Sequence, residues 1–233
     1  MRRAVVAILV FIIIASTLVT WAILPHESEP VFMPLSRSAA VEVVALPKPV
    51  LKGNVSVEEA LQNRRSVREY TDAAISLGEL SQLLWAAQGV TNAQGFRTAP
   101  SAGALYPLDV YAVNATGVYH YNTQNHSLGR ITSTNVQENL TKAALGQSAV
   151  RTAPLVLVIT GVYERTAAKY GDRAERYVHL EAGHAAQNVL LECAALGLGA
   201  VPIGAFDDAR VQAALGIPGD HQPLYVIPIG HIS

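Results

Sequence analysis

Apolar residues recur with two different periods after residue 53, and the pattern predicts a mixed α+β domain. A helical period begins after Ser56 and again after Ser76, and both starts have the Ser-x-x-Glu form of a capping box. Gly89 ends the second of these helices. Strand-like runs cover residues 108–113, 117–121, 155–160, 200–206 and 224–229, and further helical patterns cover residues 135–145, 175–196 and 207–215. The sequence therefore predicts one domain in which helices and strands alternate.

The first 24 residues have a different character from the domain. Residues 4–24 form an uncharged apolar run. A helix needs ~20 such residues to cross a bilayer, so this run is long enough. Arg2 and Arg3 precede this run, so the positive-inside rule predicts a single-pass anchor in the cell membrane with the domain outside the cytoplasm. A cleaved signal peptide is the alternative.

Scattered prolines and the absence of a helical period predict an extended linker at residues 25–52. The expected organisation is thus an anchor or signal segment at 1–24, this linker, and a folded domain at 53–233.

Composition narrows the classes of function. The chain has 233 residues, half of them hydrophobic, which is enough for one core. Its formal charge of −1 offers no basic field for a nucleic-acid backbone, so no nucleic-acid partner is predicted. The single cysteine, Cys193, lies in an apolar helical pattern and is expected to be an inert core thiol.

A cluster of cations follows the first helix. Arg64, Arg65, Ser66 and Arg68 place three guanidiniums and a hydroxyl within five residues. Guanidinium forks suit phosphate oxygens, so the cluster predicts an anion site, with a solvated basic turn as the alternative. Further along, residues 97–107 read RTAPSAGALYP. Their small side chains would let a flat ligand approach the backbone closely.

The longest helical pattern carries a polar stripe. Tyr177, Glu181, His184 and Asn188 fall on one face of an otherwise apolar helix, and such a stripe needs polar partners at a ligand or subunit interface. Glu181 and His184 also have the Glu-x-x-His spacing of a di-iron helix. The second copy that such a centre needs is not found in the sequence, so no metal site is predicted.

The order of these motifs over residues 54–231 resembles the FMN-dependent nitroreductase superfamily, and within it the SagB-type dehydrogenases related to azoline oxidases. The motifs are RRS-x-R, RTAPSAGALYP, the pair Lys169-Tyr170, EAGHAAQN, ALGLGAVPIGAF and LYVIPIGH. The resemblance implies a three-layer α/β/α sandwich with a central, mostly antiparallel sheet, and a homodimer in which both subunits build each flavin site.

The resemblance also implies roles for particular residues. The phosphate and ribityl chain of FMN would be held by Arg64, Arg65, Ser66 and Arg68. The flavin ring would be lined by Pro100, Ser101, Ala102, Gly103 and Leu105, and a backbone N–H from Gly204 or Ala205 would reach flavin N5. Lys169 and Tyr170 would do acid–base work, with a surface dipeptide as the alternative.

The expected reaction is hydride transfer between a small organic substrate and FMN, as in azoline dehydrogenases. One alternative is NAD(P)H-dependent reduction of a nitro compound or quinone. Another is a membrane-tethered module that binds flavin without catalysis.

Overall fold

The computed structural model describes residues 42–232. The predicted membrane anchor at residues 1–24 and the first part of the predicted linker lie outside this range. Within residues 42–232, every helix is too short or too polar to cross a bilayer.

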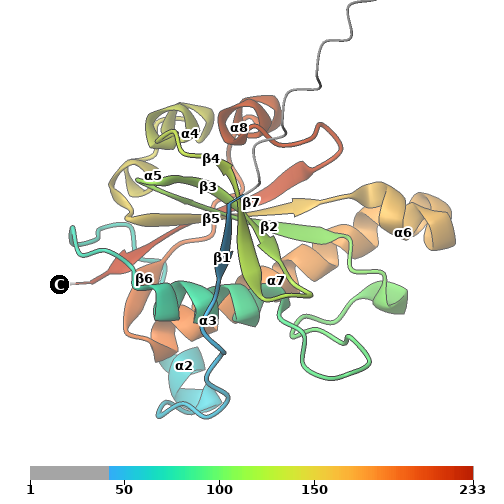
Figure 1. The fold of residues 1–233 in the computed structure, drawn as a ribbon, viewed down its shortest axis with the longest axis horizontal. Coiled ribbons are helices and arrows are strands. Elements are labelled where there is room, and N and C mark those ends of the chain that lie inside the picture. The colour runs from blue at the N-terminus through green and yellow to red at the C-terminus, as the bar shows by residue number, and fades with distance from the viewer. Residues whose placement is uncertain (1–41, 233) are drawn as a thin grey trace, which may run out of the picture. The chain divides into compact units, whose positions relative to one another are not determined.

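A seven-stranded sheet forms the middle of the domain, and each neighbouring pair of strands is antiparallel (Figure 1). In spatial order the strands are β1 (Val43–Ala45), β4 (Ser127–Thr132), β3 (Gly117–Asn122), β2 (Leu108–Asn114), β5 (Leu155–Gly161), β7 (Gln222–His231) and β6 (Leu198–Ala200). All seven residues of β5 are buried, as expected for a strand that is covered on both faces.

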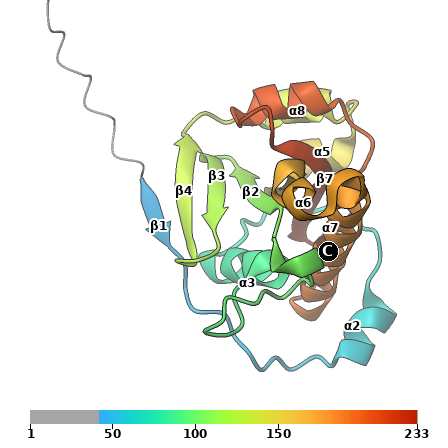
Figure 2. The same cartoon turned by 90° about the vertical axis from the view of Figure 1, so that its right-hand side faces the viewer.

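Helices cover both faces of this sheet (Figures 1 and 2). One layer contains α3 (Leu77–Gln88) and α7 (Ala174–Ala195), and the other contains α4 (Gln137–Ala143), α5 (Ser148–Thr152) and α8 (Asp208–Leu215). The helices α2 (Val57–Asn63) and α6 (Tyr163–Tyr170) contact α7. The predicted α+β sandwich with an antiparallel sheet is therefore confirmed.

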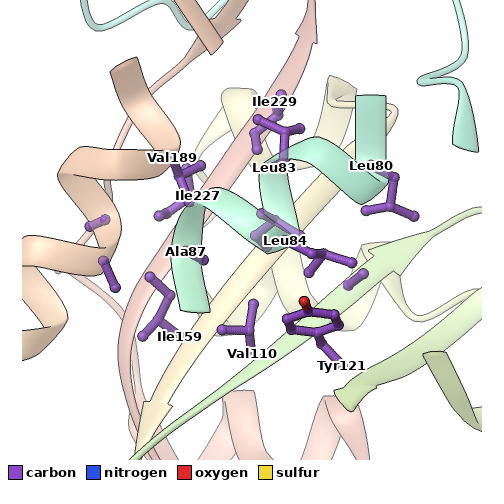
Figure 3. Packing of buried hydrophobic residues seen from close by; sticks show 14 of the residues in the cluster. Leu80, Leu83, Leu84, Ala87, Val110, Tyr121, Ile159, Val189, Ile227 and Ile229 are labelled. Carbon is purple, nitrogen blue, oxygen red and sulfur yellow. The ribbon is translucent and has the colours of Figure 1, made fainter. Parts of the chain in front are cut away.

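The larger core lies between α3, α7 and the sheet (Figure 3). Leu83 and Leu84 of α3 are fully buried and lie over strand residues such as Val110 and Ile159. Burying a leucine side chain contributes roughly 1.5–3 kcal/mol, so these contacts fix α3 on the sheet. The position of α3 matters for function, because its last residue, Gln88, lies close to the candidate site.

Local signals located the helix starts correctly. The side chains of Ser56 and Ser76 each accept a hydrogen bond from the backbone N–H three residues later. The side chains of Glu59 and Glu79 in turn accept from the backbone N–H groups of these serines, so both predicted capping boxes are present. The Asp207 side chain caps α8 by accepting from the Arg210 N–H.

Three strands differ from the sequence expectations, and one of them, β4, lies where no strand was expected. Residues 43–45, expected in the linker, form edge strand β1 by pairing with β4. The expected strand at 200–206 is replaced by β6 at Leu198–Ala200, and beyond it only Ile203 bridges to Val226. Pro202 lies between them and has no N–H to donate, which interrupts the ladder.

Candidate active site

The arginine segment, residues 64–68, is held along strand β6. The Arg64 N–H ends helix α2 by donating to Ala60 O, and Val67 N donates to Ala200 O at 3.0 Å. A Cβ built on Gly199 would lie 2.7 Å from the Val67 side chain, so the close approach of this segment requires glycine at that position. The backbone of the segment is therefore fixed while its polar side chains point outward.

The cations of this segment are free to meet an anion. Arg64 is half-buried, and Arg65, Ser66 and Arg68 are exposed. Arg65 Nη1 donates to two backbone oxygens, those of Gln62 and Arg64. Across residues 42–232, none of the three guanidiniums pairs with a carboxylate. Arg64 and Arg65 also line a cavity of about 230 Å³ beside the C-terminal end of α7, which Ser66 and Arg68 do not line.

The strap, defined here as residues 100–105, has an unusual backbone. It contains a 3-10 turn at Ala102–Ala104, with φ of 62° at Gly103 and 54° at Ala104, and Tyr106 follows with φ of 49°. Non-glycine residues rarely adopt positive φ, and such strain persists only where the surroundings enforce it. The Ser101 hydroxyl helps to enforce it by accepting from Tyr106 N at 2.9 Å.

Lys169 and Tyr170, in the last turn of α6, lie against this strap. A Cβ built on Gly103 would lie 2.9 Å from Tyr170 Oη and 3.0 Å from Lys169 Nζ. The Tyr170 ring also packs edge-on against Tyr177, with 5.0 Å between the ring centroids. The structure thus brings the predicted acid–base pair into contact with part of the predicted ring-lining loop.

Gly204 opens onto a cavity with a volume of about 980 Å³. A Cβ built on Gly204 would meet no atom within 4 Å, so its backbone is accessible. The neighbouring Ala205 is held by its carbonyl oxygen, which accepts from Gln147 Nε2. Gly171 and Asp172, which follow Tyr170 directly, line the same cavity. The predicted N5-facing residue therefore shares a cavity with the turn that follows the acid–base pair.

A buried polar cluster beneath the strap was not identified as such from the sequence. Glu181 is 3% exposed, and Gln88 is fully buried. Arg97 donates to Gln88 Oε1 at 2.9 Å and stacks over the Tyr106 ring. The only sequence signals were a glutamine at the end of an apolar helical stripe and Glu181 in the polar stripe of the long helix.

Burial raises the pKa of Glu181 to about 7, although Ser101, Arg97 and Gln88 act to lower it. Burial also lowers the pKa of Arg97, an effect opposed by the carboxylates of Asp109 and Glu181. The two groups therefore influence each other's charge.

A second ionic network, also absent from the sequence predictions, fixes α6 to the sheet. Asp109 accepts from His120 Nε2 at 2.7 Å and pairs with Arg165 Nη1 at 2.8 Å. Burial alone would raise the pKa of Asp109, but the hydrogen bond from His120 and the positive charge of Arg165 lower it overall. Because Arg165 lies one turn before Lys169, this network positions the helix that carries the predicted acid–base pair.

The arginine segment and the strap lie near opposite ends of α7. Arg64 and Arg65 share a cavity with Cys193 near the C-terminal end, whereas Ser101 is near enough to lower the pKa of Glu181, which lies in the first half of the helix. Twelve helical residues separate these two positions, which corresponds to roughly 18 Å along the axis. One chain thus brings together the strap and the acid–base pair, but not the strap and the arginines.

Comparison with known proteins identifies the relatives of this chain. The model of the nitroreductase family matches residues 61–231. A protein of Methanocaldococcus jannaschii that is named as a nitroreductase is 48% identical over 183 residues, covering 76% of this chain and 91% of the relative. A trifolitoxin operon protein of Rhizobium leguminosarum bv. trifolii is 25% identical and covers 74% of this chain and 54% of its own length.

Solved structures agree with this relationship. A structure from Ralstonia eutropha, named as a nitroreductase, has a TM-score of 0.75 and 31% identity, covering 82% of this chain and 90% of that one. A structure from Desulfovibrio desulfuricans, named as a nitroreductase in complex with FMN, has a TM-score of 0.59 and 25% identity, covering 76% and 86%. The chain therefore belongs to the nitroreductase family, whose members are usually FMN-dependent oxidoreductases.

Proposed function

We propose that this protein is an FMN-dependent oxidoreductase that removes hydride from a small organic substrate, in the manner of the SagB-type azoline dehydrogenases. The observation that carries the proposal is the contact of Lys169 and Tyr170 with the strap at Gly103, beside a cavity that reaches Gly204. Bound FMN supplies the chemistry of accepting a hydride and passing on its electrons. A protein of the trifolitoxin operon is among the relatives of the chain.

The described residues fit the cofactor in two respects. The guanidiniums of Arg64, Arg65 and Arg68 lack carboxylate partners within residues 42–232, so they can serve a phosphate. The Gly204 backbone borders open space, where an N–H can reach a ligand without obstruction by a side chain. A fixed backbone dipole at that place stabilises developing charge without reorganising.

We also propose that the working unit is a homodimer. Each chain presents its strap and its arginine segment near opposite ends of α7. A two-fold axis that places the α7 helices of two copies antiparallel brings the strap of one copy toward the arginines of the other. Leu180, on the outer face of α7, is 53% exposed in the single chain, which is consistent with a surface covered by a second copy.

Within such a site the acid–base work falls to Lys169 Nζ or Tyr170 Oη. Removing a hydride from a carbon next to nitrogen or oxygen requires that a proton also leave the substrate. Both atoms lie against the strap at Gly103, and the one that is in its deprotonated form, as the neutral amine of Lys169 or the phenolate of Tyr170, would accept that proton from the substrate. A proton held at either atom would return to solvent after product release.

The second candidate function is NAD(P)H-dependent reduction of a nitro compound or a quinone. The observation that favours it is the 48% identity with a protein named as a nitroreductase. In this reaction the substrate receives hydride, and no base is needed to take a proton from it. The two candidates therefore differ in their need for Lys169 and Tyr170.

Anaerobic half-reactions test this difference. The oxidised flavoprotein is mixed separately with a thiazoline peptide and with NADH while flavin absorbance is followed. We expect Lys169→Met and Tyr170→Phe to slow bleaching by the thiazoline, with Lys142→Met as the control because Lys142 is an exposed lysine on α4. Bleaching by NADH alone would favour the reductase. A colourless protein that does not take up FMN, or a flavoprotein that no donor bleaches, would contradict both.

A further inference from the structure

Three buried polar side chains from distant parts of the sequence meet under the strap. Gln88 ends α3, Arg97 begins the loop that leads to the strap, and Glu181 lies in the first half of α7. Arg97 is half-buried, and the other two residues are almost fully buried. Their meeting point is set by the packing of α3 on α7.

The hydrogen bonding of this cluster is incomplete. Within the described part of the chain, Gln88 Nε2, Arg97 Nε and Glu181 Oε1 are buried and have no hydrogen-bond partner. A buried carboxylate that lacks donors is costly in its ionised form, and protonation removes much of that cost. Burial therefore favours the protonated form of Glu181, and it raises the pKa of this carboxyl to about 7.

The neighbouring charges set the balance between these states. The positive charge of Arg97 lowers the pKa of Glu181, but burial has the larger effect and raises this pKa overall. The pKa of Arg97 is in turn raised by the charge of Asp109 on β2 and lowered by the charge of Arg165 on α6. The Tyr106 phenol lies under the Arg97 guanidinium, and the Tyr121 phenol on β3 is close enough for the charge of Arg97 to lower its pKa, against the larger effect of burial.

The cluster is joined to the strap by direct contacts. The Ser101 side chain is near enough to the Glu181 carboxyl to lower its pKa, and the Ser101 hydroxyl accepts from Tyr106 N. The Tyr106 hydroxyl accepts from Arg97 N at 3.3 Å. Gly103, which lies against the acid–base pair, is only two residues beyond Ser101. Because the strap is held in strained backbone conformations, its position depends on these contacts.

We propose that Glu181 is a positioning residue whose protonation state sets how the strap lies against Lys169 and Tyr170. With a proton, the Glu181 carboxyl carries no charge, and the Arg97 guanidinium remains on Gln88 Oε1 and over the Tyr106 ring. Without the proton, the Glu181 carboxylate attracts the Arg97 guanidinium. It then competes with Gln88 Oε1 and the Tyr106 ring, which hold this guanidinium at present. The inference rests on the proposed function only in giving Lys169 and Tyr170 a part in the reaction.

Hydrogen–deuterium exchange of the peptide covering residues 97–107 tests this without substrate. Exchange rates, corrected for the intrinsic effect of pH, are compared across pH 5.5–8.5 in the FMN-loaded wild type, E181Q and E192Q. Glu192 lies on the same helix near Gln82, away from the strap, so E192Q is a matched control. We expect a step in protection near pH 7 in the wild type and in E192Q, and loss of that step in E181Q.

A wild-type strap without a step, or a step that survives in E181Q, would overturn the proposal. A purely structural role for Glu181 would lower protection at every pH instead of removing the step. If E181Q does not fold, infrared titration of the wild type still decides, because a buried protonated carboxyl that disappears near pH 7 is expected and its absence refutes the inference. Failure of the thiazoline half-reaction would leave these readouts unchanged, so the two proposals fail separately.

Discussion

Replacing Glu181 with glutamine should change how the stability of the domain depends on pH. Glutamine has nearly the shape of a protonated glutamate, so the packing beneath the strap is retained while the titration is removed. In the wild type the pKa rises from an ordinary value of 4.5 to about 7 in the folded state, mainly through burial. Between these values the folded protein holds a proton that the unfolded chain has released.

The sign and size of the effect follow from this difference. Below about pH 4.5 both states are protonated, and Glu181 has no pH-dependent effect on stability. As the pH rises toward 7, unfolding releases a proton, so stability falls, and above the folded pKa the loss is complete. At about 1.4 kcal/mol per pKa unit the full loss is about 3 kcal/mol, of which about 2 to 3 kcal/mol falls between pH 5 and pH 8.

Urea unfolding at pH 5, 6, 7 and 8 measures this difference. We expect E181Q to gain about 2 to 3 kcal/mol of stability relative to the wild type between the lowest and the highest pH. Glu175→Gln, an exposed carboxylate on the same helix, serves as the control and should show no such gain. A difference between E181Q and wild type that stays constant with pH would refute the burial argument.

Two further substitutions test the strap and the network that fixes α6. Gly103→Ala should lower turnover while FMN content is retained, because the new Cβ would lie 2.9 Å from Tyr170 Oη. Gly95→Ala is the control, since Gly95 also has positive φ but lies in open space. An equal loss of turnover in both variants would contradict the predicted clash with Tyr170. Asp109→Asn should cost about 1 to 3 kcal/mol at neutral pH. Since the pKa of Asp109 is lowered in the folded state, this wild-type advantage should vanish as acid protonates the carboxylate, and a deficit that persists in acid would count against it.

The elements that local sequence signals specify were predicted well. The helices after Ser56 and Ser76 begin where a capping box satisfies the first free N–H groups, and that chemistry lies within four residues. Strand β5 is a continuous apolar run, and such a run between polar segments can be recognised from the sequence of the strand itself. The signal that identifies each of these elements lies within its own residues, although β5 is held in place by pairing with the distant strands β2 and β7.

The elements that were missed depend on distant partners. Strand β1 has three residues in a proline-rich segment, and it forms because β4 offers an open edge. Strand β4 was not predicted either, since Gly129 and Arg130 interrupt its apolar pattern. Strand β4 is stabilised by its antiparallel pairing with β3, which its own residues do not indicate.

The candidate site shows the same division between local and distant information. The pair Lys169-Tyr170 and the small residues of the strap are each short motifs, so they could be named from the sequence. The cluster of Gln88, Arg97 and Glu181 could not, because the residues are up to 93 positions apart and become neighbours only when α3 packs on α7. Glu181 alone looked like one member of a polar stripe, and the fold instead buries it while leaving His184 exposed.

Helix α7 determines how the parts of the site can combine. It has 22 residues and is therefore about 33 Å long, and it carries core side chains along one face over much of that length. Because this packing makes the helix a rigid spacer, the strap and the arginine segment cannot approach each other within one chain by a small movement. We therefore propose that a cofactor held by both groups lies between two copies, in which case a variant that prevents association should lose FMN and dimerisation together.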